Sequence, residues 1–315
     1  MKRIAVVIPV FNELAILPEL FTRVERACER LEGLAWRVIL VDDGSRDGSL
    51  EAMIRQTEAD PRYEVLELSR NFGHQAAITA GLAHADADAV VVMDGDLQDP
   101  PELIPELVGA WRDGGEVVLA SRRSRRESGI LRRLGFAGFY RLFGWMSDGP
   151  VDVRSGVFGL MDRRVLAELN RLTERNRFLP GLRAWLGFER REVSYDRAER
   201  AGGEAKQSLP RLIKYAVDAL LSFSFKPLRI MTYAGLVISL VAFVLAAVFV
   251  VKRLAGIEVA QTGFTTLVTL VLFLGGIQLI GIGLLGEYLG RTYDEVKNRP
   301  LYVVRRRHRG ERPGE

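Results

Sequence analysis

Cysteine is nearly absent from this chain of 315 residues, since Cys28 is its single thiol. One thiol cannot form a disulfide within the chain, so a disulfide-stapled scaffold is excluded and a reducing compartment fits. Two nucleotide-binding signatures are missing as well. No GxGxxG follows the first apolar segment and no GxxxxGK[ST] occurs, so the dinucleotide fingerprint and the P-loop are both absent.

Charge is absent from two long stretches, residues 230–251 and 264–286. Each is long enough to cross ~30 Å of hydrocarbon as a helix, with a buried core helix as the alternative. Basic residues gather before the first stretch and after the second, while the loop between them carries only Lys252 and Arg253 against Glu258. The positive-inside rule therefore predicts a multi-pass protein of the inner (plasma) membrane with a cytoplasmic N-terminal domain and both termini in the cytoplasm.

The chain divides by composition into a soluble part and a membrane part. Residues 208–229 have apolar positions at helical spacing, which predicts an amphipathic helix in the membrane interface, with a core helix as the alternative. Glycines in the second stretch allow close helix packing within one chain or between chains. The predicted parts are a soluble domain (1–207), the interfacial helix (208–229), two membrane helices (230–251 and 264–288), an outer loop (252–263) and a basic cytoplasmic tail (289–315).

Within the soluble part, apolar strand-like segments alternate with segments of helical period. The predicted strands are 3–10, 37–41, 63–68, 89–93 and 116–120, and the predicted helices are 14–31, 48–57, 74–85 and 102–112. This alternation predicts an α/β fold with a mostly parallel sheet flanked by helices. Ligands of such sheets bind beyond the carboxyl ends of the strands, and polar residues cluster at those positions.

Three carboxylates follow the fourth predicted strand, in the segment VVVMDGDLQDPP. Asp94 and Asp96 are separated by Gly95, which allows a tight turn that aims both side chains at one point. Mg²⁺ and Mn²⁺ prefer carboxylate oxygens, so this pair is a candidate metal–diphosphate site. Asp99, before two prolines, is instead predicted to cap the next helix. Of the histidines on the third helix, His84 is predicted to be structural, whereas His74 could face the ligand.

Several sequence motifs of the chain resemble those of a known protein family. The segments VVIPVFNE, VDDGSRDGS, LSRNFGHQAAITAGL and MDGDLQDPPELIPEL resemble the family 2 glycosyltransferases of GT-A fold. The second half, with GEYLGRTYDEVKNRPLYVV after the apolar stretches, resembles the polyprenyl-phosphate branch, which includes bactoprenol glucosyltransferases and dolichol-phosphate mannose synthases. The resemblance implies transfer of one sugar from a UDP- or GDP-linked donor to a polyprenyl (undecaprenyl) phosphate, with inversion, and no nucleic-acid partner.

The resemblance also implies roles for individual residues on the donor side. Asp94, Asp96 and Gln98 would hold the divalent metal, Mg²⁺ or Mn²⁺. Asp42 or Asp43 would hold the nucleobase or ribose. The remaining donor-side candidates are Pro9, Glu13 and Arg70, which would shape or face the pocket, and Arg200 and Lys206, which belong to a loop expected to close over the donor phosphates.

On the acceptor side, Arg122 and either Arg132 or Arg133 match the region of acceptor-phosphate arginines. One departure concerns the segment SGVFGLMDR, which has Val157 and Gly159 where many bactoprenol members carry an acid and an arginine. Asp152 and Ser155 match the mannose-transferring form instead, so Asp152 is the candidate carboxylate, and the donor sugar stays open. The catalytic candidates are thus Asp96, Asp152 and Arg122.

Other classes of protein remain as alternatives. A processive polysaccharide synthase shares the fold, but two spans form no channel and a QxxRW motif is missing. A catalytically inactive membrane scaffold or lipid-binding regulator would keep the fold without the reaction. A nucleotidyltransferase is disfavoured because the predicted spans imply a lipid-bound acceptor. By resemblance, a homo-oligomer such as a tetramer is expected.

Overall fold

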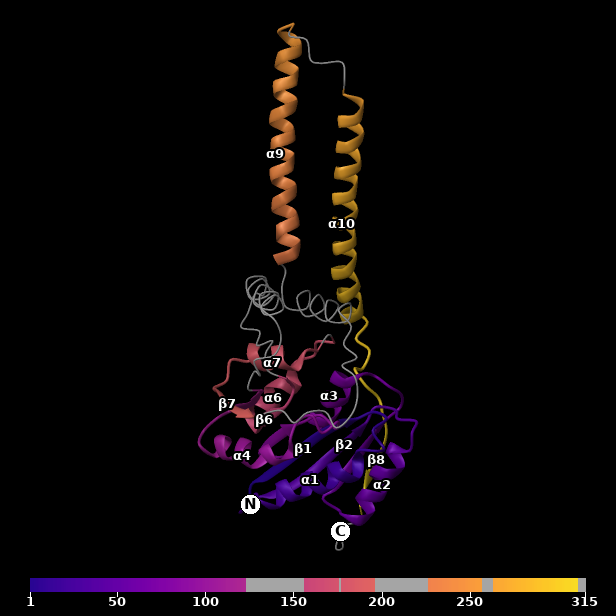
Figure 1. The fold of residues 1–315 in the computed structure, drawn as a ribbon, viewed down its shortest axis with the longest axis vertical. Coiled ribbons are helices and arrows are strands. Elements are labelled where there is room, and N and C mark those ends of the chain that lie inside the picture. The colour runs from indigo at the N-terminus through magenta and orange to yellow at the C-terminus, as the bar shows by residue number, and fades with distance from the viewer. Residues whose placement is uncertain (123–155, 176, 196–225, 257–262, 311–315) are drawn as a thin grey trace, which may run out of the picture. The chain divides into compact units, whose positions relative to one another are not determined.

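The computed structural model describes residues 1–122, 156–175, 177–195, 226–256 and 263–310 (Figure 1). The chain forms two compact units. One holds a sheet with its helices and includes the segment that begins at residue 299, and the other holds two long helices. The predicted interfacial helix falls almost entirely on residues 208–225, which lie outside the described part of the chain.

The first unit is built on a sheet of eight strands in the order β7-β5-β6-β4-β1-β2-β3-β8. The central strand β1 (Arg3–Val10) pairs in parallel with β2 (Ala35–Asp42) and β4 (Ala89–Val92), and β2 pairs in parallel with β3 (Tyr63–Leu68). These strands are rich in valine and isoleucine and are buried on both faces, which is typical of a parallel sheet covered by helices. The predicted fold class is confirmed.

Helices cover both faces of the sheet. α1 (Leu17–Glu29), α2 (Ser49–Ala59) and α4 (Ile104–Arg112) share one hydrophobic core with side chains of β1. α3 (His74–His84) covers the opposite face, where Gly81 lies so close that an added Cβ would be 2.3 Å from a methyl group of Val7. α1, α3 and α4 fall within the predicted segments, and α2 extends two residues past its predicted end at residue 57. α1 starts three residues later than predicted, with Pro18 in its first turn, and a 3-10 turn (Pro101–Leu103) precedes α4.

The sheet continues beyond the segments that the sequence pattern identified. β6 (Gly159–Asp162) runs antiparallel to both β4 and β5 (Val117–Arg122), and β7 (Arg190–Tyr195) pairs in parallel with β5. α6 (Arg163–Arg171) and α7 (Leu179–Trp185) lie between β6 and β7 in sequence. In this backbone a Cβ at Gly159 would lie 2.5 Å from the carbonyl oxygen of Val118, so the glycine permits the close β5–β6 pairing.

The basic C-terminal segment corrects one expectation. It was predicted to be a cytoplasmic tail, but residues Val304–Arg309 form strand β8, which pairs antiparallel with β3 at the edge of the sheet. Without β8, strand β3 would be the edge of the sheet and would leave a row of backbone polar groups unpaired. Residues 304–309 are therefore part of the folded first unit.

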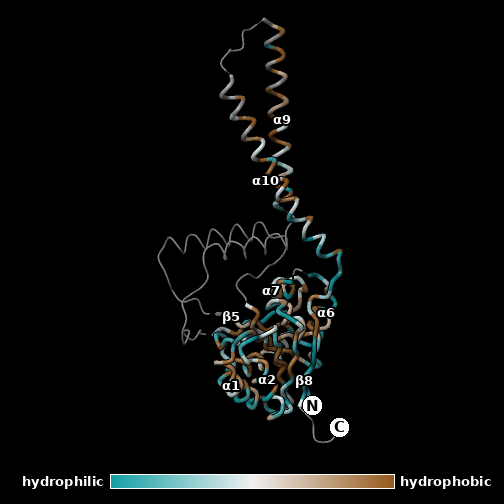
Figure 2. Tube along the Cα trace, turned by 90° about the vertical axis from the view of Figure 1, so that its right-hand side faces the viewer, coloured by the Kyte–Doolittle hydropathy of each residue, from teal (hydrophilic) through white to brown (hydrophobic). Residues whose placement is uncertain are grey.

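The described helices of the second unit are α9 (Lys226–Leu254) and α10 (Phe264–Val296). Within the described residues, these two helices are long and apolar enough to cross a membrane. Figure 2 shows hydrophobic residues along their length, and large side chains such as Phe243 and Leu279 are 74% and 72% exposed. Exposed apolar surface on this scale is unfavourable in water, so the helices favour a lipid environment. Both helices extend past the predicted spans, because charged residues continue the helical turns.

Candidate functional site

A cleft of about 440 Å³ opens at the carboxyl ends of β1 and β4, where the topology predicts a ligand site. It is bounded by the ends of these strands, the loop after β3 and the start of α3. Its lining residues are Pro9, Val10, Phe11, Glu13, Asp43, Asn71, Gly73, His74, Ala77, Asp94, Gly95 and Asp96. Six of the residues predicted from the sequence therefore meet in one place: Pro9, Glu13, Asp43, His74, Asp94 and Asp96.

The acidic turn after β4 is held tightly against β1. A Cβ at Gly95 would lie 3.0 Å from the carbonyl oxygen of Pro9, so this position has little room for a side chain. Leu97 adopts a positive φ of 58°, and Asp96 Oδ1 accepts a hydrogen bond from the Gln98 backbone N–H at 3.0 Å. The turn thereby fixes Asp96 at the cleft. Gln98 was predicted as a metal ligand, but it contributes its backbone to the turn and is not among the cleft-lining residues.

His74, the first residue of α3, contacts the acidic turn directly. Its Nε2 lies 2.8 Å from Asp94 Oδ1. Burial opposes the charged form of His74, but the hydrogen bond and charge of Asp94, together with Asp43 and Asp96, outweigh it and raise the pKa of His74. The imidazole therefore orients Asp94, as a second layer of ligands commonly does in metal sites. His84, at the other end of α3, bonds the Ala80 carbonyl at 2.8 Å and is not among the cleft-lining residues.

The two aspartates at the end of β2 have different surroundings. Asp42 accepts hydrogen bonds from the backbone N–H groups of Gly44 and Ser45 at 3.2 Å each and does not line the cleft. Asp43 lines the cleft and accepts the N–H groups of Phe72 and Gly73 at 2.7 and 3.0 Å. Burial raises the pKa of both carboxyl groups. Of the two candidates for the nucleobase or ribose, only Asp43 is placed to touch a ligand.

A hydrogen-bond network fixes the loop that follows β1. Asn12 accepts from the Arg46 backbone N–H at 2.8 Å, and the Glu13 N–H donates to Ser49 Oγ at 3.0 Å. Glu13 thus reaches the cleft from a braced loop. Burial, and then the negative charges of Asp96 and Asp47, raise the pKa of Glu13. The cleft has a strongly acidic wall, which suits a cation or a cation–diphosphate complex.

Of the predicted arginines, Arg70 is the one whose side chain is described, and it is not among the cleft-lining residues. The Arg70 guanidinium lies over the Phe72 ring at 4.0 Å and donates to the Asn71 carbonyl at 2.8 Å, so it stabilises its own loop. Arg122 is the last residue of β5, and its backbone alone is described. The other predicted residues lie outside the described residues: Arg132, Arg133, Asp152, Ser155, Arg200 and Lys206.

Asp99 was predicted to cap the helix that follows it, and this prediction is wrong. It is 2% exposed and accepts a hydrogen bond from the Tyr195 hydroxyl at 2.7 Å, whereas the 3-10 turn that follows has Pro100 as its capping residue and no side-chain cap. The pattern Asp-Pro-Pro resembles a cap locally. The partner, on β7, lies 96 residues further along the chain and could not be recognised from that pattern.

Sequence reasoning also missed some of the cleft residues, among them Phe11 and Asn71. Both lie within motifs that were recognised, VVIPVFNE and SRNFGH, but neither side chain is titratable. A search for charged groups after each strand therefore passed over them. Within the described residues, no group of three His, Cys, Asp or Glu side chains forms a complete metal site. The pair Asp94 and Asp96 instead fits a metal that completes its shell with ligand phosphates.

An α/β domain with an Asp-Gly-Asp turn in a cleft at the carboxyl edge of its parallel strands is a GT-A glycosyltransferase domain. The chain belongs to glycosyltransferase family 2: the family described as Glycosyl transferase family 2 matches residues 5–169, and the GtrB C-terminal hairpin matches residues 226–292. The chain is accordingly a glycosyltransferase.

Curated relatives match over almost the whole chain. The bactoprenol glucosyl transferase of Shigella phage SfII is 40% identical over 98% of this chain and 99% of its own length. An uncharacterized glycosyltransferase of Bacillus subtilis strain 168 is 40% identical over 96% of this chain and 93% of its own length. Among solved structures, glucosyl-3-phosphoglycerate synthase from Mycobacterium tuberculosis has a TM-score of 0.47 and 21% identity, over 70% of this chain and 76% of that chain.

Proposed function

We propose that this protein transfers one sugar from a UDP- or GDP-linked donor to the phosphate of a polyprenyl lipid such as undecaprenyl phosphate. The observation that carries the proposal is the combination, in one chain, of the acidic cleft and two helices apolar enough to lie in a membrane. Relatives named bactoprenol glucosyl transferase are 39–40% identical to this chain over nearly their full length. The product would supply sugar for cell-envelope glycan or lipid modification.

On the donor side, Asp94 and Asp96 are the residues that would hold a divalent metal, Mg²⁺ or Mn²⁺. Such an ion, when bound, screens the diphosphate and stabilises the leaving group as charge develops on it. The chain prepares this site in advance, because the Gln98 N–H fixes Asp96 and the imidazole of His74 fixes Asp94. Asp43 and Glu13 face the same cleft, and Asp43 is the better placed of the aspartate pair to bind nucleoside hydroxyl or ring N–H groups.

On the acceptor side, the lipid phosphate is its own nucleophile. The second pKa of a phosphate monoester is about 6, so the group is mostly a dianion at neutral pH and requires no general base. One of its oxygens bonds to the anomeric carbon as the bond from that carbon to the nucleotide diphosphate breaks, which inverts the centre. Arg122, with Arg132 or Arg133, would position the phosphate, and Arg200 and Lys206 would neutralise the departing diphosphate. Asp152 and Ser155 would contact the sugar or the acceptor.

The proposed setting is the inner membrane, with the catalytic domain and both termini in the cytoplasm. This orientation rests on the basic residues that flank the apolar helices, since Lys226 and Arg229 precede the first span and Arg291 and Lys297 follow the second. A cytoplasmic active site would have access to nucleotide-sugars and to the lipid phosphate at the membrane surface. The glycines of α10 permit a homo-oligomer such as a tetramer.

The test is a transfer assay with the full chain in detergent. Purified protein is incubated with undecaprenyl phosphate, Mg²⁺ or Mn²⁺ and labelled UDP- and GDP-sugars, and the label in the lipid phase is counted. Asp96→Ala should lose at least ~10³-fold of the transfer rate if the metal supplies several kcal/mol of transition-state stabilisation. Asp113→Ala, at an exposed position after α4, is the matched control and should transfer normally.

Three outcomes decide the proposal. Lipid-linked label that depends on metal and on Asp96 supports it and identifies the donor. Protein that binds nucleotide-sugar yet moves no label with any donor contradicts it and favours an inactive scaffold or regulator. Transfer that proceeds equally well without lipid phosphate overturns the lipid-acceptor mechanism.

A further inference from the structure

Strand β8 supplies positive charge to two buried carboxylates of β3. Glu64 and Glu67 are only 5% and 8% exposed, although they lie in an otherwise apolar strand. Arg309 Nε lies 3.1 Å from Glu64 Oε2, Arg307 also pairs with Glu64, and Arg305 lies 3.3 Å from Glu67. Buried carboxylates are costly unless they are paired, so β3 needs the cations that β8 brings.

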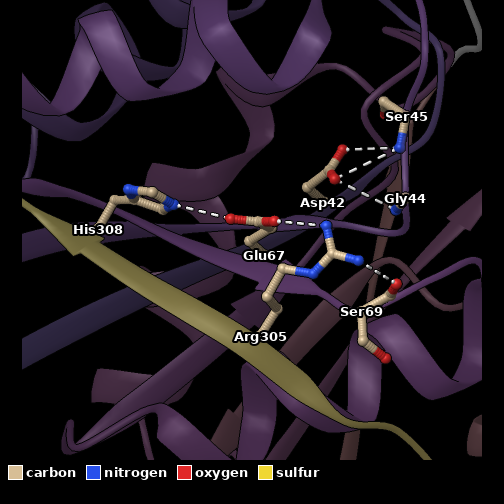
Figure 3. Close-up of polar contacts among 7 residues, drawn as sticks. All are labelled: Asp42, Gly44, Ser45, Glu67, Ser69, Arg305 and His308. Atoms are coloured by element: carbon tan, nitrogen blue, oxygen red, sulfur yellow. Dashed lines mark hydrogen bonds and ion pairs between the residues drawn. The ribbon is translucent and has the colours of Figure 1, made fainter.

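Arg305 makes a second contact that the other arginines of β8 do not share. One of its terminal nitrogens pairs with Glu67, and the other donates to the Ser69 carbonyl at 2.9 Å (Figure 3). His308 holds the other Glu67 oxygen at 3.1 Å. The Ser69 N–H donates to the Val303 carbonyl at 2.9 Å. Both backbone polar groups of Ser69, the first residue after β3, are therefore held by the C-terminal segment.

Ser69 begins the short loop, residues 69–73, that leads into the cleft. At the far end of this loop, Phe72 and Gly73 donate their N–H groups to Asp43. In the middle, a Cβ on Gly44 would lie 2.7 Å from the Asn71 nitrogen, so the loop backbone packs directly against the turn after β2. The loop is fixed at one end by β8 and at the other by a residue that lines the cleft.

We propose that Arg305 is a positioning residue of the donor site: through Ser69 it braces loop 69–73, and this loop sets the position of Asp43 and the nucleotide end of the cleft. Residues 297–303 alone separate α10 from β8, so the segment that follows the second apolar helix is also the one that supports the donor pocket. The identity of the bound ligand as a nucleotide-sugar rests on the proposed function. The bracing itself does not, because it concerns contacts within the chain.

The first measurement is hydrogen–deuterium exchange of the full chain in detergent without ligand. Arg305→Ala removes a charge-assisted hydrogen bond, so the amides of Phe72 and Gly73 should exchange about tenfold faster than in the parent protein. Arg307→Ala is the matched variant on the same strand, because it loses an ion pair with Glu64 but no contact with Ser69. Arg306→Ala removes an exposed arginine of the same strand for which no ion pair occurs among the described residues.

The expected pattern is faster exchange at loop 69–73 in Arg305→Ala, with little change there in the other two variants. Arg305→Lys should restore part of the protection, because an ammonium can bond the Ser69 carbonyl but cannot bridge it to Glu67 with a planar fork. Equal exchange of this loop in Arg305→Ala, Arg306→Ala and the parent would overturn the proposal. Faster exchange over the whole sheet in both Arg305→Ala and Arg307→Ala would also overturn it, because Arg305 would then stabilise the strand alone.

A second readout links the loop to the donor. In the transfer assay, Arg305→Ala should raise the KM for the donor several-fold and leave kcat within about twofold. The acidic turn that would hold the metal follows β4, and β1, β2 and β3 separate β4 from β8 in the sheet. A fall in kcat with an unchanged KM would contradict a donor-positioning role. If the parent protein transfers no sugar, the proposed function fails, but the exchange experiment still decides whether Arg305 braces the loop.

Discussion

Asp42 and Asp43 are neighbours in sequence, but one side chain supports a turn and the other lines the cleft. Successive side chains of a strand point to opposite faces, so only one of two adjacent carboxylates at the end of β2 can face the cleft. That residue is Asp43. Asp42 is 1% exposed and closes the turn after the strand through the N–H groups of Gly44 and Ser45. The sequence identifies the pair, and the backbone geometry separates their roles.

Replacing Asp42 with Asn should stabilise the fold at neutral pH. Burial raises the pKa of Asp42 above its ordinary value, so ionisation of this group costs more in the folded than in the unfolded chain. Stability is thus lost as the pH rises from about 4 through the folded pKa. Asn carries no charge and keeps an oxygen that can accept from Gly44 and Ser45. Thermal unfolding should give Asp42→Asn the higher Tm at pH 7.5, with the gap closing toward pH 4.

An exposed carboxylate provides the control for this experiment. Asp113→Asn should leave the Tm unchanged across the same pH range, since Asp113 lies at the surface after α4. If Asp42→Asn melted below the parent protein at every pH, the ionised carboxylate would be a net stabilising acceptor of its two N–H bonds, and burial would not dominate its energetics.

Tyr195→Phe and Tyr63→Phe should lose similar stability, but only Tyr195→Phe should also lose activity. Each substitution removes one buried hydroxyl hydrogen bond, from Tyr195 to Asp99 or from Tyr63 to the Phe21 carbonyl, and each should cost about 1 kcal/mol. Asp99 follows the acidic turn at the cleft, whereas Tyr63 lies at the start of β3, the opposite end from the cleft. Only Tyr195→Phe should lower the transfer rate, by about tenfold. Equal rates for both variants would make the Tyr195–Asp99 bond purely structural.

At the scale of elements, the turn between β4 and α4 depends on one small residue. An added methyl group at Gly95 would sit 3.0 Å from the Pro9 carbonyl oxygen, which forces a shift of a few tenths of an ångström. Because a displacement of about 1 Å can cost about 10²-fold in rate, Gly95→Ala should lower transfer by about tenfold. Gly109→Ala in α4, where nothing lies within 4 Å, should transfer like the parent protein. Unchanged transfer in Gly95→Ala would show that the turn tolerates the shift.

The elements that the sequence predicted well are those with a local pattern. β1 to β5 and α1 to α4 have apolar runs or helical spacing that follow from burial on one or two faces, and the acidic turn, Glu13 and His74 follow directly from where those strands end. The pattern also placed both apolar helices. What it could not fix was which carboxylate faces the cleft, because that depends on the register of a strand.

The elements that were missed are defined by contacts between distant residues. β8 reads VRRRHR, which by composition is a solvated basic tail, and its partners Glu64 and Glu67 lie more than 230 residues earlier. Neither segment indicates the other, because a charge pair between strands is visible only once the sheet is assembled. The same holds for the bond between Tyr195 and Asp99, which replaced a helix cap that the local pattern favoured.

At the scale of the whole molecule, the two units differ in where their apolar side chains lie. The first buries its apolar residues in a core, whereas α9 and α10 expose theirs. Figure 2 shows the hydrophobic residues along these two helices. A chain with this composition is stable only if the second unit leaves water. The flanking basic residues then set its orientation, and with it the side of the membrane on which the cleft meets its substrates.

This orientation can be measured with engineered cysteines, because the native cysteine is not expected to react with the label. Cys28 is fully buried, and burial raises its pKa to about 12, so the folded protein should not react with maleimide at this position. In intact bacterial cells, a membrane-impermeant maleimide should label Gly263→Cys, which precedes α10, and should not label Arg299→Cys, which follows it. Permeabilised cells should show labelling of both variants, and the parent protein should stay unlabelled throughout. Labelling of Arg299→Cys alone in intact cells would place the catalytic cleft outside, away from cytoplasmic nucleotide-sugars, and would contradict the proposed reaction together with the topology.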